Sequence, residues 1–225
     1  MAYNNTQALQ MKELGNQAYK NKDYSQAINY YTKAIQLNPQ DPNFYSNRAL
    51  CYFNMEKFID CVADCDRATK LNPTFVKAYK KKASALAHQL KFSEAVQVMK
   101  EAVNCERDNL ALKNELEEYE TFESNYNRYL EGERSKNYGD ALSCVTYLCN
   151  KLPLSKILKM YRVEALAKTG ETDQATALLK NLSNRNDPDY LYLVGLIELY
   201  SGDSAKAKKH FMEGLQLDPD HAKCK

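Results

Sequence analysis

The sequence predicts an all-α protein built from stacked helix pairs, and three observations support this prediction. The 225 residues include only 7 glycines and 6 prolines, too few turn formers for a protein of many short strands. Small residues recur with spacings of 34, 34, 46, 34 and 32 residues, and aromatic residues precede the first four of them by three positions. The small residues are Ala27, Cys61, Ala95, Ala141, Ala175 and Ala207.

The first unit shows the pattern most clearly. Apolar residues recur at helical spacing from Met11 to Tyr19, a polar turn follows at residues 21–23, and a second amphipathic helix runs from Ala27 to Ile35. Pro39 then ends the unit. Because a small residue lets two helix axes approach closely, each unit is expected to form a tight antiparallel helix pair. Such a pair cannot bury its apolar stripe alone, so the pairs should stack into a right-handed superhelix.

The 46-residue spacing interrupts the repeat in the middle of the chain. Residues 110–133 contain no proline, a single glycine and several glutamates, a composition that favours one long continuous helix. We therefore expect about six helix pairs in two three-repeat blocks joined by a long helix. The units are expected at residues 8–41, 42–75, 76–109, 122–155, 156–187 and 188–221.

This pattern resembles the tetratricopeptide repeat over almost the whole chain, and most clearly in the first unit. The expected organisation is a three-repeat block at 8–109, an extended capping and linking helix at 110–133, a second block at 122–221 whose first helix overlaps the linker, and the start of a truncated helix at 222–225. Units four and five fit the repeat less well. Tyr129 and Gly132 replace the usual small and aromatic residues, and unit five has no closing proline.

Functional residues in such a stack are expected on the face made by the first helix of each pair. Lys12 and Asn16 lie one turn apart in the first unit, Asn47 lies on the equivalent helix of the second, and Lys77 and Lys81 lie one turn apart in the third. Together they offer three ammonium groups and two carboxamides to one groove, which suits a ligand with two carboxylates.

These five residues resemble the carboxylate clamp of tetratricopeptide cochaperones, which holds the C-terminal Glu-Glu-Val-Asp tail of heat-shock proteins 70 and 90. The resemblance implies that Lys12, Asn16 and Asn47 hold the carboxylates of the terminal aspartate, and that Lys77 and Lys81 complete the cationic wall. Lys81 departs from the pattern, since arginine is common there, and lysine lacks the planar fork for a bidentate contact.

The neighbours of these residues have less specific roles. Lys80 and Lys82 are expected to be solvated charges at the rim of the groove. Apolar groove contacts are expected from Leu50, Phe53 and Leu86, although helix-pair packing is the alternative for all three. In the second block, the alternatives for Tyr161, Tyr190 and Tyr192 are a second peptide groove and the core, and the lack of a matching Lys/Asn set favours the core.

Other classes of function find little support. A net charge of +2 without a long basic run argues against a nucleic-acid partner, and no apolar stretch is long enough for a membrane span. The seven cysteines include no Cys-x-x-Cys pair, so they are expected to be core residues of a cytoplasmic protein, with no metal or other cofactor. No phosphate loop, nucleophile elbow or His/Asp/Ser set is present, so no enzyme is expected.

A clamp block, a long helix and three divergent repeats look most like the N-terminal repeat region of cochaperones that also carry a J domain (DnaJ subfamily C). The His-Pro-Asp signature of a J domain does not occur in the sequence. We therefore expect a chaperone adaptor, or a fragment of one, that binds the tail of heat-shock protein 70, heat-shock protein 90 or both, and clients on the second block. The alternative is a scaffold or assembly subunit whose groove binds internal peptide segments.

Overall fold

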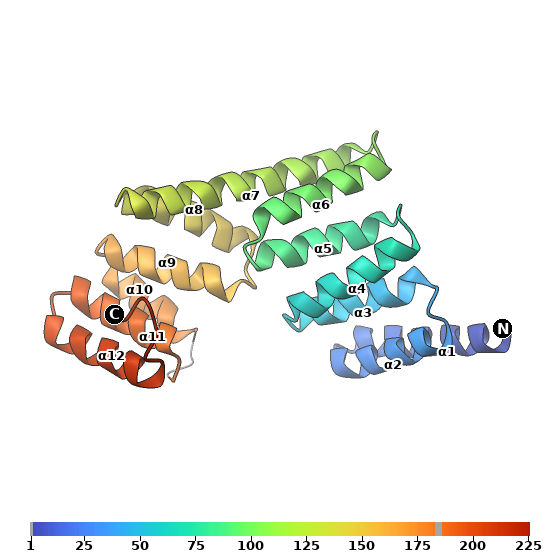
Figure 1. Cartoon of the computed structure of the whole chain (residues 1–225), viewed down its shortest axis with the longest axis horizontal. Coiled ribbons are helices and arrows are strands. Elements are labelled where there is room, and N and C mark those ends of the chain that lie inside the picture. Colours follow the sequence, from blue (N-terminus) through green and yellow to red (C-terminus); the bar gives the residue numbers. More distant parts are fainter. Residues whose placement is uncertain (1, 183–185) are drawn as a thin grey trace. The chain divides into compact units, whose positions relative to one another are not determined.

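The computed structural model describes residues 2–182 and 186–225, and in these ranges it contains twelve α-helices and no strand (Figure 1). The predicted all-α fold class is therefore confirmed. The helices are α1 Ala2–Lys20, α2 Tyr24–Leu37, α3 Pro42–Asn54, α4 Phe58–Leu71, α5 Val76–His88, α6 Phe92–Cys105, α7 Leu110–Arg134, α8 Tyr138–Lys151, α9 Lys156–Lys168, α10 Thr172–Lys180, α11 Pro188–Tyr200 and α12 Ser204–Leu217.

Small residues bring the two helices of each pair together. Five of the six recurring small residues are fully buried, and the sixth, Ala207, is 1% exposed. Gly15 adds to this packing in the first pair, because a Cβ atom there would lie 2.6 Å from the ring of Tyr31 on α2. The period seen in the sequence is therefore the period of the helix crossings.

The first helix of every pair ends in the same kind of turn. One residue of each turn has a positive φ, between 58° and 62° in the first four pairs and 87° or 96° in the last two. These residues are Lys22, Glu56, Leu90, Lys136, Gly170 and Gly202, and each lies five positions before the small residue of its unit. Only two of the six are glycines, so the hairpin imposes the left-handed conformation even on larger residues. The low glycine content is thus compatible with many turns.

A buried ion pair fixes the position of α3. The Arg48 guanidinium donates two hydrogen bonds to Asp64 on α4, at 2.7 and 2.8 Å, and a third to Thr32 Oγ1 on α2 at 2.8 Å. The side chain of Asp64 is 2% exposed. Since Arg48, Asp64 and Thr32 all form hydrogen bonds within this network, it sets the register of α3 against α2 and α4.

The chain divides into two compact units, and α7 belongs to both. The N-terminal unit ends at Glu123 and the C-terminal unit begins at Ser124. Within the first unit, Phe122 of α7 contacts the Phe92 ring of α6, with 6.4 Å between the ring centroids. Within the second unit, Arg128 of α7 pairs with Asp140 of α8 at 2.6 Å. Helix α7 therefore packs on the third pair and also acts as the first helix of the fourth.

The helix start predicted at 222–225 is wrong. Residues 222–224 form a turn, closed by a 3.2 Å hydrogen bond from the Cys224 N–H to the His221 carbonyl. The Cys224 thiol packs against Gly214, so closely that a Cβ atom added at Gly214 would lie 2.8 Å from the sulfur. Lys223 forms an ion pair with Glu164 of α9. These side-chain contacts bring the segment back onto the C-terminal unit as a turn.

Candidate functional site

The predicted site residues lie on α1, α3 and α5, the first helices of the three pairs in the N-terminal unit. The two asparagines meet directly, because Asn47 Nδ2 lies 3.5 Å from Asn16 Oδ1. The Tyr31 hydroxyl donates a shorter hydrogen bond, 2.8 Å, to the same oxygen. Since Tyr31 is buried, with 2% exposure, its hydroxyl fixes the orientation of the Asn16 carboxamide.

Asn16 has a second neighbour that the sequence pattern did not reveal. Its Nδ2 group donates a 3.1 Å hydrogen bond to the exposed carboxylate of Glu13, three residues earlier on α1. The Asn16 Nδ2 group has two N–H donors, so an incoming carboxylate would share this nitrogen with Glu13 and would meet the negative charge of Glu13. Helical spacing places the two side chains within reach, and this spacing was the available signal for the contact.

Lys81 lies against an aromatic ring from the adjacent helix. Its ammonium nitrogen is 4.1 Å from the centroid of the Phe53 ring on α3, well within the range of a cation–π contact. Phe53 is in turn held by His88 and Phe58, whose ring centroids lie 5.3 and 5.5 Å away. The partial burial that results lowers the pKa of Lys81, because the charged form loses solvation. Phe53 therefore positions the Lys81 ammonium group.

The three lysines of the predicted site differ from the neighbouring lysines of α5, because the neighbouring lysines form ion pairs with carboxylates of the protein. Lys80 pairs with Glu115 of α7 and Lys82 with Asp66 of α4, each at 2.6 Å. Their side chains are 43% and 23% exposed, so both are partly solvated as expected, and in addition each forms a surface ion pair. Among the described residues, Lys12, Lys77 and Lys81 form no ion pair. Helices α1 and α5 thus carry three cations whose charge no described carboxylate neutralises.

The apolar residues predicted to contact a ligand divide into two groups. Leu50 and Phe53 are half-buried on α3, where part of each side chain remains accessible. Leu86 is 2% exposed, so its expected groove contact is wrong. The last turn of α5 faces the core with four consecutive buried residues, 85–88, and this leaves no open side for Leu86.

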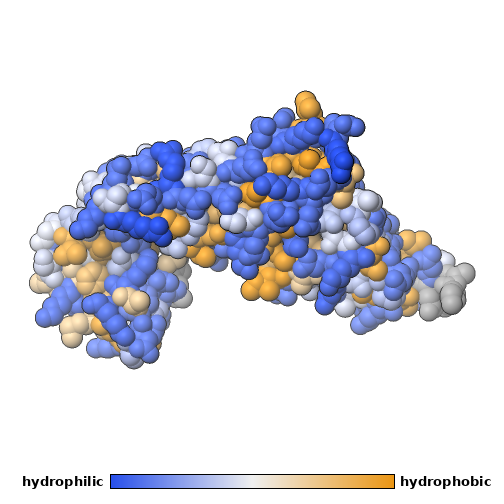
Figure 2. Space-filling model, turned by 45° about the horizontal axis from the view of Figure 1, so that its top comes forward, coloured by the Kyte–Doolittle hydropathy of each residue, from blue (hydrophilic) through white to orange (hydrophobic). Residues whose placement is uncertain are grey.

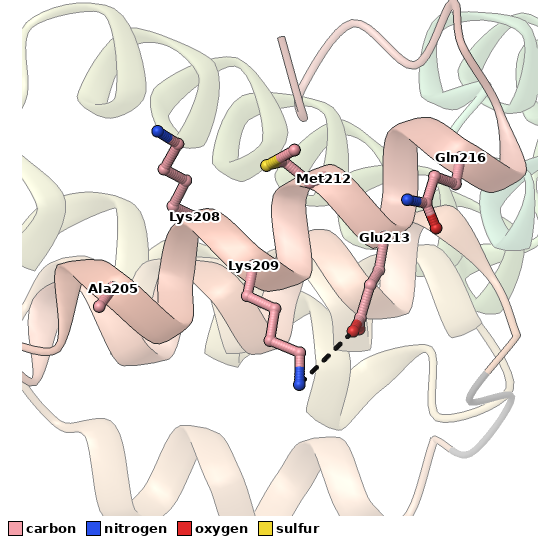
Figure 3. A pocket seen from close by; sticks show the side chains of 6 residues that line it. All are labelled: Ala205, Lys208, Lys209, Met212, Glu213 and Gln216. Carbon is pink, nitrogen blue, oxygen red and sulfur yellow. Dashed lines mark ion pairs between the residues drawn. The ribbon is translucent and has the colours of Figure 1, made fainter.

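Other surface features offer less for recognition. Where Figure 2 shows the surface, hydrophilic residues predominate and hydrophobic ones form separate small areas. A shallow depression near the C-terminus is formed by α12 alone, and Figure 3 shows its side chains along that helix, with Lys209 and Glu213 paired at 3.9 Å. No group of three metal-binding side chains occurs in residues 2–182 or 186–225. In the same ranges, no helix is both long and apolar enough to cross a membrane.

All seven cysteines are free thiols, and six of them are buried. Cys61 and Cys65 lie one turn apart on α4, in the core beneath Tyr45 and Phe53 of α3. The interpretation of the cysteines as small core residues is therefore confirmed for six of them, and Cys105 is only partly buried.

Family models of the repeat match three parts of the chain. The model described as "TPR repeat" matches residues 15–55, and models described as "Tetratricopeptide repeat" match residues 42–75 and 188–221. The last two ranges coincide with the second and sixth units predicted from the sequence.

Curated relatives match along nearly the whole chain. Human "DnaJ homolog subfamily C member 7" is 26% identical over 221 residues, which cover 94% of this chain and 43% of that protein. "Hsp70-Hsp90 organizing protein 1" of Glycine max is 27% identical over 239 residues, covering 93% of this chain and 41% of that protein. The chain therefore spans less than half the length of these relatives.

A solved structure supports the fold over the same range. The crystal structure of the P58(IPK) TPR domain superimposes with a TM-score of 0.72 and covers 96% of this chain and 62% of that one. At 14% sequence identity, this similarity concerns the fold alone. Together with the twelve helices of the described residues, it shows a fold of stacked helix pairs, and the family matches show that residues 15–75 and 188–221 are tetratricopeptide repeats.

Proposed function

We propose that the N-terminal unit binds an acidic peptide by its free C-terminus, through Lys12, Asn16, Asn47, Lys77 and Lys81. The observation that carries this proposal is the difference between neighbouring lysines on α5. Lys80 and Lys82 have carboxylate partners within the protein, whereas Lys77 and Lys81 have none among residues 2–182 and 186–225. Unpaired cations on adjacent helices favour a ligand that brings its own carboxylates.

The proposed ligand is the Glu-Glu-Val-Asp tail of heat-shock protein 70 or 90. Its last residue has two carboxylates, the side chain and the chain terminus, and the groove offers ammonium and carboxamide donors on three helices. Asn47 Nδ2 and Asn16 are already in contact, so little ordering of these side chains is needed. Phe53 and Leu50 are both half-buried on α3, and Phe53 contacts Lys81, so these two side chains are the proposed apolar contacts for the valine of the tail.

The relatives favour the same interpretation. One of them is named for organising heat-shock proteins 70 and 90, and another belongs to DnaJ subfamily C. We therefore propose that this chain acts as a chaperone adaptor in the cytoplasm, by binding and without a catalytic step. We also propose that this adaptor consists of two three-repeat blocks joined by a linking helix, with the blocks at 8–109 and 122–221 and the linker at 110–133. A client site is proposed on the second block.

Calorimetric titration of the whole chain tests which residues bind the peptide. A peptide ending in Glu-Glu-Val-Asp should bind to the unmodified protein, and Lys77→Ala should weaken its binding about tenfold, because an accessible charge contact is lost. Lys91→Ala is a suitable control, since Lys91 is an exposed lysine of the same unit that pairs with Glu94. Equal weakening by both substitutions would mean that only net charge matters, and would contradict the proposal.

A further inference from the structure

The C-terminal unit has a cavity on the equivalent face of its own first helices. This cavity has a volume of about 270 Å³ and lies between α9 and α11. It is lined by Ile157, Met160, Tyr161, Glu164, Asp189, Tyr192, Leu193 and Lys223. The sequence pattern favoured core packing for Tyr161 and Tyr192, and the structure shows that both also line this cavity.

The ammonium group of Lys223 occupies this cavity. The Lys223 nitrogen donates a 2.8 Å hydrogen bond to Glu164 Oε2. It also lies 5.5 Å from the ring centroid of Tyr161 and 5.1 Å from that of Tyr192. Two aromatic rings and a carboxylate around one ammonium group are the components of an aromatic cage for a cation.

The walls of this cage are fixed independently of Lys223. The other oxygen of Glu164, Oε1, accepts hydrogen bonds from Lys168 at 2.8 Å and from the Tyr192 hydroxyl at 3.0 Å. Tyr161 stacks on Tyr129 of α7, with 5.2 Å between ring centroids. Glu164 therefore keeps its position without Lys223, and its Oε2 atom is directed into the cavity.

Glu164 is also held in its ionised form. Burial alone would raise its pKa, but hydrogen bonds from Lys168 and Lys223 outweigh this effect and lower it. The side chain is 8% exposed, so its charge is poorly screened by water. A second cation that entered the cavity in place of Lys223 would meet the same negative charge.

Lys223 is a more easily displaced partner than the residues around it. Its side chain is 44% exposed, and it lies in the turn at residues 222–224 and not in a helix. The buried Cys224 and the contact of His221 with Asp189 hold the turn itself, so the Lys223 side chain can leave the cavity while the turn stays in place. Withdrawing Lys223 thus leaves the cage walls intact and moves an exposed side chain into water.

We propose that this cavity is a binding site for a lysine side chain of a basic peptide segment, and that Lys223 is its intramolecular competitor. The ligand has the opposite charge to the one proposed for the N-terminal unit, and the two proposals are independent. Glu164 Oε2 needs an N–H donor, so unmodified lysine should bind, whereas acetyllysine has lost the charge and trimethyllysine has lost the donor.

Fluorescence anisotropy of the whole chain tests this proposal. The probe is a dye-labelled, C-terminally amidated peptide, Gly-Ser-Lys-Gly-Ser-Lys-Gly-Ser. Lys223→Ala should tighten its binding about tenfold, because a tethered competitor has been removed. Lys225→Ala is the matched control, since Lys225 is an exposed lysine two residues away that pairs with Asp220. If both substitutions tighten binding equally, only the net charge has changed and the proposal is overturned.

A second set of variants tests the walls of the cage. In the Lys223→Ala background, Glu164→Gln should abolish binding of the lysine peptide, whereas Glu131→Gln, at an exposed position of α7, should leave it unchanged. Tyr161→Leu is the alternative if Glu164→Gln does not fold, because Tyr161 is only half-buried, and it should weaken binding several-fold. Unchanged binding in the folded cage variants, or equal binding of the acetyllysine peptide, would overturn the proposal.

Discussion

The first helices of the two units present opposite chemistry on the same scaffold. In the N-terminal unit, α1, α3 and α5 carry two asparagines and three lysines that form no ion pair with any described residue. In the C-terminal unit, α9 and α11 carry tyrosines and a buried glutamate that binds Lys223. The small residues and turns that shape the helix pairs are alike in both. The residues that build a repeat are therefore largely separate from those proposed to bind a ligand, and we expect that each unit can be altered without the other.

The largest expected effect comes from removing two lysines from one helix. Lys77→Ala with Lys81→Ala should weaken binding of the Glu-Glu-Val-Asp peptide about 100-fold, which corresponds to about 2.7 kcal/mol. Lys80→Ala with Lys82→Ala removes the same charge from the same helix, but these lysines already have carboxylate partners. This control should change affinity less than about threefold in calorimetry. Similar losses of peptide affinity in the two double variants would contradict the proposed difference between paired and unpaired lysines.

Glycine substitutions test whether the two units respond separately. A Cβ atom at Gly15 would lie 2.6 Å from the Tyr31 ring, and one at Gly195 would lie 2.5 Å from the Phe211 ring. Each Gly→Ala change should destabilise its own unit by about 1–3 kcal/mol, as amide hydrogen exchange would show. Only Gly15→Ala should also weaken peptide binding, because Tyr31 holds Asn16. Loss of peptide binding in Gly195→Ala would contradict this separation.

The pH dependence of peptide binding distinguishes Lys81 from an exposed lysine. Because burial lowers its pKa, Lys81 should lose its charge at a lower pH than ordinary lysines, and peptide affinity should fall as the pH rises through that range. Lys81→Arg keeps a permanent charge, so it should bind the peptide with a flatter pH profile. Identical profiles for the two proteins, measured by calorimetry at several alkaline pH values, would exclude Lys81 from the site.

The smallest expected effect concerns the carboxylate beside Asn16. Glu13→Gln removes a negative charge next to the groove and weakens the hydrogen bond that occupies Asn16 Nδ2, so peptide affinity should rise about twofold. Glu101→Gln, at another exposed position in the N-terminal unit, is the matched control. Equal gains in both variants would indicate a general charge effect and no competition at Asn16.

Much of the fold could be predicted from the sequence, because two helices can cross closely only where a small residue stands at the crossing. The repeat period of these residues therefore marks the helix pairs. Cys61 and Ala95 both follow Ala27 at 34-residue intervals, and all three are fully buried in the structure. The partners of individual charges were less predictable. Lys80 pairs with Glu115, which lies 35 residues away, and Lys223 with Glu164, which lies 59 residues away. Such contacts depend on how neighbouring helices are placed, which the repeat period does not specify.

The central claim is that the N-terminal groove recognises a free C-terminal carboxylate, and one calorimetric comparison tests it most directly. Three peptides would be titrated into the unmodified chain: one ending in Glu-Glu-Val-Asp, the same peptide with a C-terminal amide, and one in which Gly-Ser-Gly follows the aspartate. The clamp predicts that only the first binds well, with the other two weaker by about tenfold or more. Equal affinity for all three would show that the groove accepts internal segments and would contradict the clamp.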